Sequence, residues 1–146
     1  MKKISKLLIV INVILLVVNF GTFLNKYNLN KDIEKMQNRY YSKFIDASKE
    51  LNEFLKSNEV KIVNSNNEYI YRLLRVEETY KAYQLFTFLN NYNETEQFKD
   101  ISYLFNDLWN VIAIGDISER SSDEIKKMSD NISELINQFS LYIDYK

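Results

Sequence analysis

The stretch that decides the fold class is SSDEIKKMSDNISELINQFSLYI, residues 121–143. Its apolar residues recur at intervals of three and four, which is the period of one helix face and not that of a strand. The narrow apolar stripe consists of Ile125, Met128, Ile132, Leu135, Phe139 and Ile143. Ser121 and Glu124 have the spacing of a capping box, which marks the start of a helix. The stretch therefore predicts an amphipathic helix over Ser122–Ile143.

The same helical period continues backward through most of the chain. It predicts three further helices over Leu29–Lys56, Asn66–Asn90 and Glu94–Ile114. The chain of 146 residues contains no proline and only two glycines, the residues that most often interrupt helices. Helices joined by short connections usually pack as antiparallel neighbours. We therefore expect an all-α fold in which the four helices form an antiparallel up-down four-helix bundle.

Helix starts and ends are marked by local signals. Ser65 with Glu68 and Asn93 with Glu96 have the capping-box spacing at the second and third predicted starts. Gly115 stands just past the predicted end of the third helix, where glycine is common. These signals predict three short connections between the helices.

The apolar stripes also predict the core. In the first helix the stripe is Leu29, Ile33, Met36, Tyr40, Phe44, Ala47, Leu51 and Phe54. In the second helix it begins with Ile70, Leu73 and Tyr80, and in the third it is Phe98, Ile101, Leu104, Phe105, Leu108 and Ile112. The opposite faces are charged or carry amides, as solvated helix faces do.

A long apolar segment precedes the bundle. From Leu7 to Asn25 there are 19 residues without a charge, of which 14 are Leu, Ile, Val or Phe. At ~1.5 Å per residue such a helix is roughly 28 Å long, close to the thickness of the hydrocarbon layer of a bilayer. The chain is thus expected to divide into a basic cytoplasmic tail at 1–6, a transmembrane helix at 7–25 and an extracytoplasmic bundle at 26–146. No residue between Phe23 and Leu29 forces a break, so the first bundle helix is able to continue the transmembrane helix.

This segment is a retained anchor, a cleaved secretory signal or a buried helix of a soluble core, and we favour the anchor. A secretory signal has an apolar region of ~7–15 residues and a small-x-small cleavage site, whereas this run is longer. The residue two positions before Gly21 is Asn19, which gives a poor cleavage context. Lys2, Lys3 and Lys6 crowd the N-terminal flank, and the positive-inside rule then places the N-terminus in the cytoplasm. The predicted location is the cell membrane, with a single span.

Two polar residues of the anchor suggest a contact within the membrane. Asn12 and Asn19 are seven residues apart, so they lie near one line along a helix. Asparagine side chains are able to hydrogen-bond across transmembrane helices, which makes this pair a candidate seam for a homo-oligomer or a partner helix. The alternative is that a strongly apolar segment simply tolerates two polar residues.

The second half of the second helix, KAYQLFTFLNNY at residues 81–92, is apolar over more than half of its circumference. It forms either the most enclosed part of the core or an interaction surface that includes Tyr83, Phe88 and Tyr92.

An up-down topology also predicts that the phenol groups of Tyr27, Tyr92 and Tyr142 cluster at the end of the bundle where the predicted anchor enters, because tyrosine favours the headgroup region of a bilayer.

The composition argues against common catalytic chemistry. The chain has no cysteine and no histidine, which removes thiol nucleophiles, disulfides and the commonest general base. No metal loop, cofactor motif or catalytic constellation is recognisable.

Glu77 is a polar residue at an unusual position, because it falls within the apolar stripe of the second helix. It is either a functional buried carboxylate with a raised pKa or a boundary residue paired with Lys81 four residues on.

These features favour a non-enzymatic role. The net charge of −1 gives no reason to expect nucleic-acid binding. The expected partners are the lipid bilayer and another protein, and the expected role is that of an interaction or structural component. The alternatives are a ligand-sensing bundle that works with a partner and a secreted helical effector released by signal cleavage.

Overall fold

The computed structural model describes residues 2–57, 66–92, 94–113 and 115–142, with side chains described from Leu15 onward. These residues form four α-helices and no strand: α1 (Lys2–Ser57), α2 (Asn66–Leu89), α3 (Glu96–Ile112) and α4 (Ser122–Ser140). A short 3-10 turn, η2 (Ile117–Glu119), lies between α3 and α4. The expectation of an all-α chain with four helices is confirmed.

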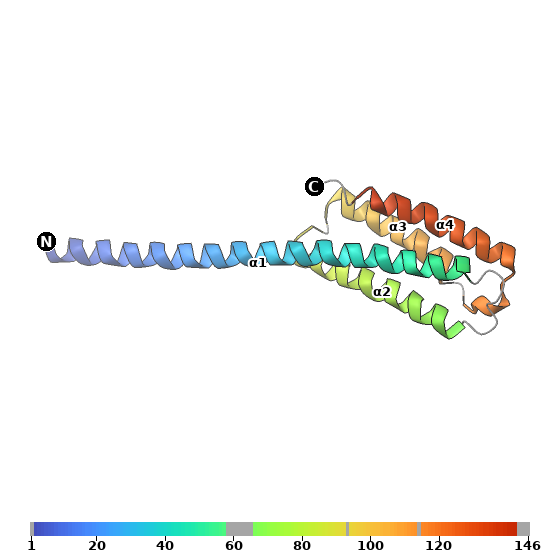
Figure 1. Cartoon of the computed structure of the whole chain (residues 1–146). Coiled ribbons are helices and arrows are strands. Elements are labelled where there is room, and N and C mark those ends of the chain that lie inside the picture. The colour runs from blue at the N-terminus through green and yellow to red at the C-terminus, as the bar shows by residue number, and fades with distance from the viewer. Residues whose placement is uncertain (1, 58–65, 93, 114, 143–146) are drawn as a thin grey trace.

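The helices alternate in direction along the bundle (Figure 1). The C-terminal half of α1 packs against α2 and α4, and α3 packs against α4. The ring of Tyr80 stacks on that of Phe105 with centroids 3.5 Å apart, which joins α2 to α3. This arrangement is that of a four-helix bundle. The N-terminal half of α1 projects from it as a single helix.

The first helix is continuous from Lys2 to Ser57 and passes without a break through Asn25, Asn28 and Asn30. This continuity is what the absence of helix-breaking residues predicted. The bundle begins only near Ile33, since every described residue from Leu15 to Asp32 is exposed.

The cap of α4 is a complete capping box. The Ser121 N–H donates to Glu124 Oε2 at 2.8 Å, and the Glu124 N–H donates to Ser121 Oγ at 3.3 Å.

The prediction for the start of α3 was wrong by two residues. Thr95 is the N-cap, because its Oγ1 accepts from the Phe98 N–H at 3.2 Å, so the helix begins at Glu96 and not at Glu94.

Two of the predicted caps involve residues outside the described ones. Ser65 and Asn93 are these residues. The capping box of Ser65 remains a prediction, whereas that of Asn93 was wrong, because Thr95 is the N-cap of α3. Gly115 follows the end of α3 and has a φ of 83°, a conformation that favours glycine. Glycine is therefore the suitable residue at this position, as its place after the helix suggested.

An aromatic cluster forms the middle of the core, with Phe44 at its centre. Phe44 is fully buried, and its ring contacts one ring from each of the other helices: Tyr80, Phe105 and Phe139. The edge-to-face contact with Phe139 has a centroid distance of 4.9 Å. Such pairs contribute about 0.5–1.5 kcal/mol each beyond the area they bury.

The predicted core positions that the structure describes are buried or partly buried, except for two that are exposed. Leu29 is 60% exposed, because it precedes the point where α1 meets the bundle. Ile70 is 41% exposed, since α2 turns Tyr69 and Val76 inward instead. Leu135 is only partly buried, and Ile136 beside it is buried. Ile143 lies outside the described residues.

A buried polar layer joins α1 to α4. Ser129 Oγ donates to Asn52 Oδ1 at 2.7 Å, and Asn52 Nδ2 donates to Ser133 Oγ at 2.7 Å. Ser133 Oγ in turn donates to the Ser129 carbonyl at 2.9 Å. Because each side chain has a partner, the layer fixes the register of the two helices without leaving a buried polar group unpaired.

Within the part of the chain whose side chains are described, no helix contains an apolar stretch of sufficient length to cross a bilayer. Residues 7–14 of the predicted anchor have side chains outside that part.

Candidate functional site

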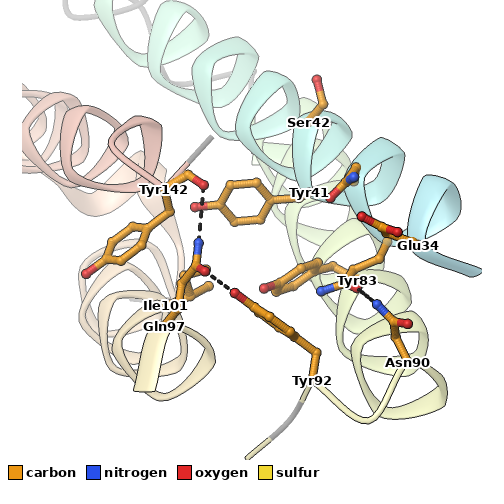
Figure 2. A pocket seen from close by; sticks show the side chains of 11 residues that line it. Glu34, Tyr41, Ser42, Tyr83, Asn90, Tyr92, Gln97, Ile101 and Tyr142 are labelled. Carbon is orange, nitrogen blue, oxygen red and sulfur yellow. Dashed lines mark hydrogen bonds between the residues drawn. The ribbon is translucent and has the colours of Figure 1, made fainter. Parts of the chain in front are cut away.

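A cavity of about 340 Å³ opens at the end of the bundle from which α1 projects (Figure 2). Polar and aromatic side chains from all four helical segments line it. They are Glu34, Gln37, Asn38, Tyr41, Ser42, Tyr83, Asn90, Tyr92, Gln97, Ile101 and Tyr142. Its volume falls within the range of small-molecule sites, about 300–1,000 Å³.

The end of α2 shapes one wall of this cavity. The Tyr92 N–H donates to the Thr87 carbonyl and the Asn91 N–H to the Phe88 carbonyl, both at 3.0 Å. Asn91 has a φ of 54°. These three features make a Schellman motif with asparagine in the left-handed position. The motif reverses the chain, so that Tyr92 lines the cavity beside side chains of α2.

Hydrogen bonds between side chains fix the walls. Asn90 Nδ2 donates to Gln37 Oε1 at 2.7 Å, which joins α2 to α1. Tyr92 Oη donates to Gln97 Oε1, and Gln97 Nε2 donates to the Tyr142 carbonyl at 3.3 Å (Figure 2). The end of α2, the start of α3 and the end of α4 are thus connected around the opening.

Two tyrosines of the cavity, Tyr41 and Tyr83, have raised pKa values. Tyr41 and Tyr83 are buried, and the loss of hydration on burial raises the pKa of both phenols above the ordinary value of 10.0. Tyr41 Oη donates to the Phe139 carbonyl at 2.7 Å, a bond that needs its proton. Among the lining residues Glu34 alone carries a formal charge.

The predicted interaction surface is divided by the structure. Phe88 is 65% exposed, as a surface residue would be. Tyr83 is 3% exposed, so its assignment to a surface was wrong and the core interpretation holds. Its ring lies 5.0 Å from that of Tyr41 and packs on the α1 side of the bundle. Tyr92 is half-buried and belongs to the cavity wall.

The expected cluster of three tyrosines is only partly formed. Tyr92 and Tyr142 line the same cavity. Tyr27 does not join them, because it lies ten residues before Gln37 on the projecting part of α1 and is 58% exposed. At ~1.5 Å per residue that separation is roughly 15 Å along the helix axis.

Glu77 is a boundary residue. Its side chain is 26% exposed and pairs with Lys81, one turn on, at 2.5 Å. Of the two interpretations of Glu77, the structure therefore supports the boundary residue paired with Lys81 over the buried carboxylate. Glu77 lies at the edge of a shallow hollow between α2 and α3, beside Tyr80 and Trp109.

The candidate seam in the anchor is described only at one of its two residues. Asn19 is exposed, and its backbone carbonyl accepts from Thr22 Oγ1 at 2.8 Å. The side chain of Asn12 lies outside the described residues. The seam therefore remains a prediction.

Sequence reasoning missed the amides of the cavity wall. Gln37, Asn90 and Gln97 each lie beside an apolar position of a predicted stripe, and amides are common on solvated faces. Only the paired Asn90 and Asn91 gave a usable signal, because consecutive asparagines favour a left-handed helix end.

Within the described residues, no cluster of three or more acidic side chains is able to hold a metal ion. Comparisons with family models, curated proteins and solved structures found no match for this chain. Function is therefore inferred from the geometry of the chain itself.

Proposed function

We propose that this chain is a single-pass membrane protein whose extracytoplasmic four-helix bundle acts as a non-enzymatic interaction or structural component. One observation carries the proposal. Every described side chain from Leu15 to Asp32 is exposed, on all sides of α1 and not along one face. The large apolar side chains among them are Leu15, Leu16, Val17, Val18, Phe20, Phe23, Leu24, Tyr27 and Leu29.

Exposure on every side supports lipid as the surrounding medium. The rest of the chain covers none of these apolar side chains, and a helix that is apolar all round is stable only in an apolar surrounding. The run from Leu7 to Asn25 is uncharged and is preceded by Lys2, Lys3 and Lys6. This flank supports a cytoplasmic N-terminus and an extracytoplasmic bundle.

An exposed apolar patch on α2 supports protein contact by the bundle. Leu85, Phe88 and Leu89 are 56%, 65% and 48% exposed, and they share one side of the last two turns of α2. Contiguous exposed apolar residues of this kind often mark interaction sites.

Cysteine labelling tests the membrane topology, because the chain has no cysteine of its own. Asp123→Cys, at the start of α4, should react with a membrane-impermeant maleimide in intact cells. Ser5→Cys should react only after the membrane is permeabilised. Equal labelling of both in intact cells would refute the proposed orientation.

A charge placed in the apolar run tests retention in the membrane. Leu16→Arg should move the protein from the carbonate-washed membrane pellet to the soluble fraction, because Arg at a span centre costs about 2.5–3.5 kcal/mol. Tyr103→Arg, at a 69% exposed position of α3, is the matched control and should stay in the pellet. Release of both variants alike would contradict an anchor at 7–25.

Site-specific photo-crosslinking tests the interaction surface. A photoreactive phenylalanine analogue at Phe88 should give a discrete protein adduct in membranes. The same analogue at Lys127, on the exposed face of α4, serves as the control. Identical adduct patterns from both positions would argue against a surface centred on Phe88.

A further inference from the structure

The cavity at the anchor end of the bundle has a consistent chemical character. Its walls offer aromatic rings and amide groups, and none of its lining residues is Lys or Arg. Glu34 adds a negative charge among the lining residues. A site with this lining disfavours anions and favours a positively charged ligand.

The phenol hydroxyls are already used by the protein. Tyr41 Oη donates to the Phe139 carbonyl, Tyr92 Oη to Gln97 Oε1, and Tyr142 Oη to Asp100 Oδ2 at 3.4 Å. A ligand that depends on many hydrogen bonds, such as a sugar, would have to break these contacts. The rings remain as part of the cavity wall, with Tyr92 half-buried and Tyr41 and Tyr83 only 7% and 3% exposed.

Two of these rings lie together, and a third lines the same cavity. The centroids of Tyr41 and Tyr83 are 5.0 Å apart, with the planes inclined by 48°. Figure 2 shows Tyr92 as part of the wall of the same cavity. Aromatic faces attract an ammonium group within about 6 Å of the centroid, and several rings around one space are the usual form of an ammonium site.

We propose that this cavity binds a small organic ammonium ion, held by the rings of Tyr41, Tyr83 and Tyr92 and by the charge of Glu34. The inference goes beyond the proposed function, and binding of a free amine does not depend on it. A lipid headgroup is the other source of the ammonium group; it rests on the proposed anchor, because the cavity opens at the end of the bundle from which α1 projects.

The test is calorimetric titration of the full chain in a non-ionic detergent. The probes are choline and 3,3-dimethylbutanol, which has the same shape but no charge. Choline should bind saturably and at least tenfold more tightly than the neutral alcohol. Equal affinities, or no saturable binding of choline, would overturn the proposal.

Two variants assign the binding to this cavity. Tyr92→Leu keeps an apolar side chain and removes the ring, and Glu34→Gln removes the charge. Each should weaken choline binding by fivefold or more. Tyr103→Leu and Glu53→Gln, at exposed positions elsewhere, are the matched controls and should bind as the parent does. The same loss in the controls would place the binding elsewhere and refute the assignment.

Circular dichroism and the urea midpoint verify that each variant is folded.

A second experiment separates the two sources of the ammonium group. In phosphatidylcholine vesicles a headgroup ligand already fills the site, so free choline should bind more weakly than in vesicles of an uncharged glycolipid, which has neither an ammonium group nor a surface charge that concentrates choline. A free-amine site gives the same affinity in both, and either result is consistent with ammonium recognition.

Discussion

Phe44 is the residue on which the four helices converge. It is fully buried and touches rings of α2, α3 and α4. Its contacts are to residues 36, 61 and 95 positions further along the chain, so no local pattern identifies it as the centre. The apolar stripe of the first helix predicted its burial but not its partners.

Truncation of this ring should be the most costly single change in the core. Phe44→Ala is expected to lower the free energy of unfolding by about 3–5 kcal/mol, because it removes a buried ring and leaves a cavity. Urea unfolding in detergent, followed by the fluorescence of the single tryptophan, Trp109, measures the loss. Leu29→Ala, at an exposed position, should change the value by less than ~0.5 kcal/mol. Similar losses in both would show that Phe44 is not central.

Buried tyrosines should make the bundle sensitive to alkali. Burial raises the pKa of Tyr69 from 10.0 to about 12, while in the unfolded chain it stays near 10.0. Between these values the unfolded state has lost the proton that the folded state keeps, so stability falls as pH rises. The contribution of Tyr69 to the free energy of unfolding is complete below pH 10.0. Above that pH we expect this contribution to fall by up to about 1.4 kcal/mol per pH unit.

Urea midpoints measured between neutral pH and pH 12 check this expectation. Tyr69→Phe removes the ionisable group, so its stability should fall less steeply with pH than that of the parent. Tyr71→Phe, at a 62% exposed position, is the control and should keep the steep slope. Tyr41 and Tyr83 also have raised pKa values, so part of the slope should remain in Tyr69→Phe. A slope equal to that of the parent would mean that Tyr69 does not contribute to the alkaline loss.

At the scale of elements, boundaries were largely predictable because they depend on neighbouring residues. The capping box at Ser121 fixed the start of α4, and the start of α2 at Asn66 agrees with the prediction. The start of α3 was less certain, since Asn93 and Thr95 are both good caps and only the path of the turn selects Thr95. The rotation of α2 about its axis depends on the other helices, which is why Ile70 was misplaced.

The polar layer between α1 and α4 should behave as a unit. Asn52→Ala leaves the buried Ser129 hydroxyl without its acceptor, which should cost about 1–3 kcal/mol. The double variant Asn52→Ala with Ser129→Ala should cost clearly less than the sum of the single changes. A double-mutant cycle by urea unfolding measures the difference, and strict additivity would show that the two side chains are not coupled.

At the scale of the whole molecule, the projecting part of α1 should contribute nothing to the stability of the bundle. No described residue before Ile33 is even partly buried. A chain lacking residues 1–25 is expected to unfold within ~0.5 kcal/mol of the full chain. A chain lacking residues 1–40 loses Gln37 and Tyr40 and should be less stable. A large loss in the shorter deletion would show that the projecting part supports the bundle.

The cavity could not be predicted from the sequence, because its walls form only when distant segments of the chain meet. Its walls come from four helical segments, and the residues that meet there are separated by up to 108 positions, from Glu34 to Tyr142. Tyrosines and amides are ordinary surface residues until the helices are assembled. The expected clustering of Tyr92 and Tyr142 was the only part of the site within reach of the sequence.

The unbroken first helix links the rotation of the bundle about the helix axis to the rotation of the projecting part of α1. The helix is continuous between Leu15 and Ile33, so the azimuth of the bundle about the helix axis is set by the azimuth of the projecting part of α1. Adding one residue at Asn28 would turn the bundle by about 100° about the helix axis and raise it by ~1.5 Å. Adding seven residues would restore the azimuth to within about 20° at a greater height. The continuous first helix thus couples the orientation of the helix face that carries Asn19 to the orientation of the bundle and of its exposed Phe88.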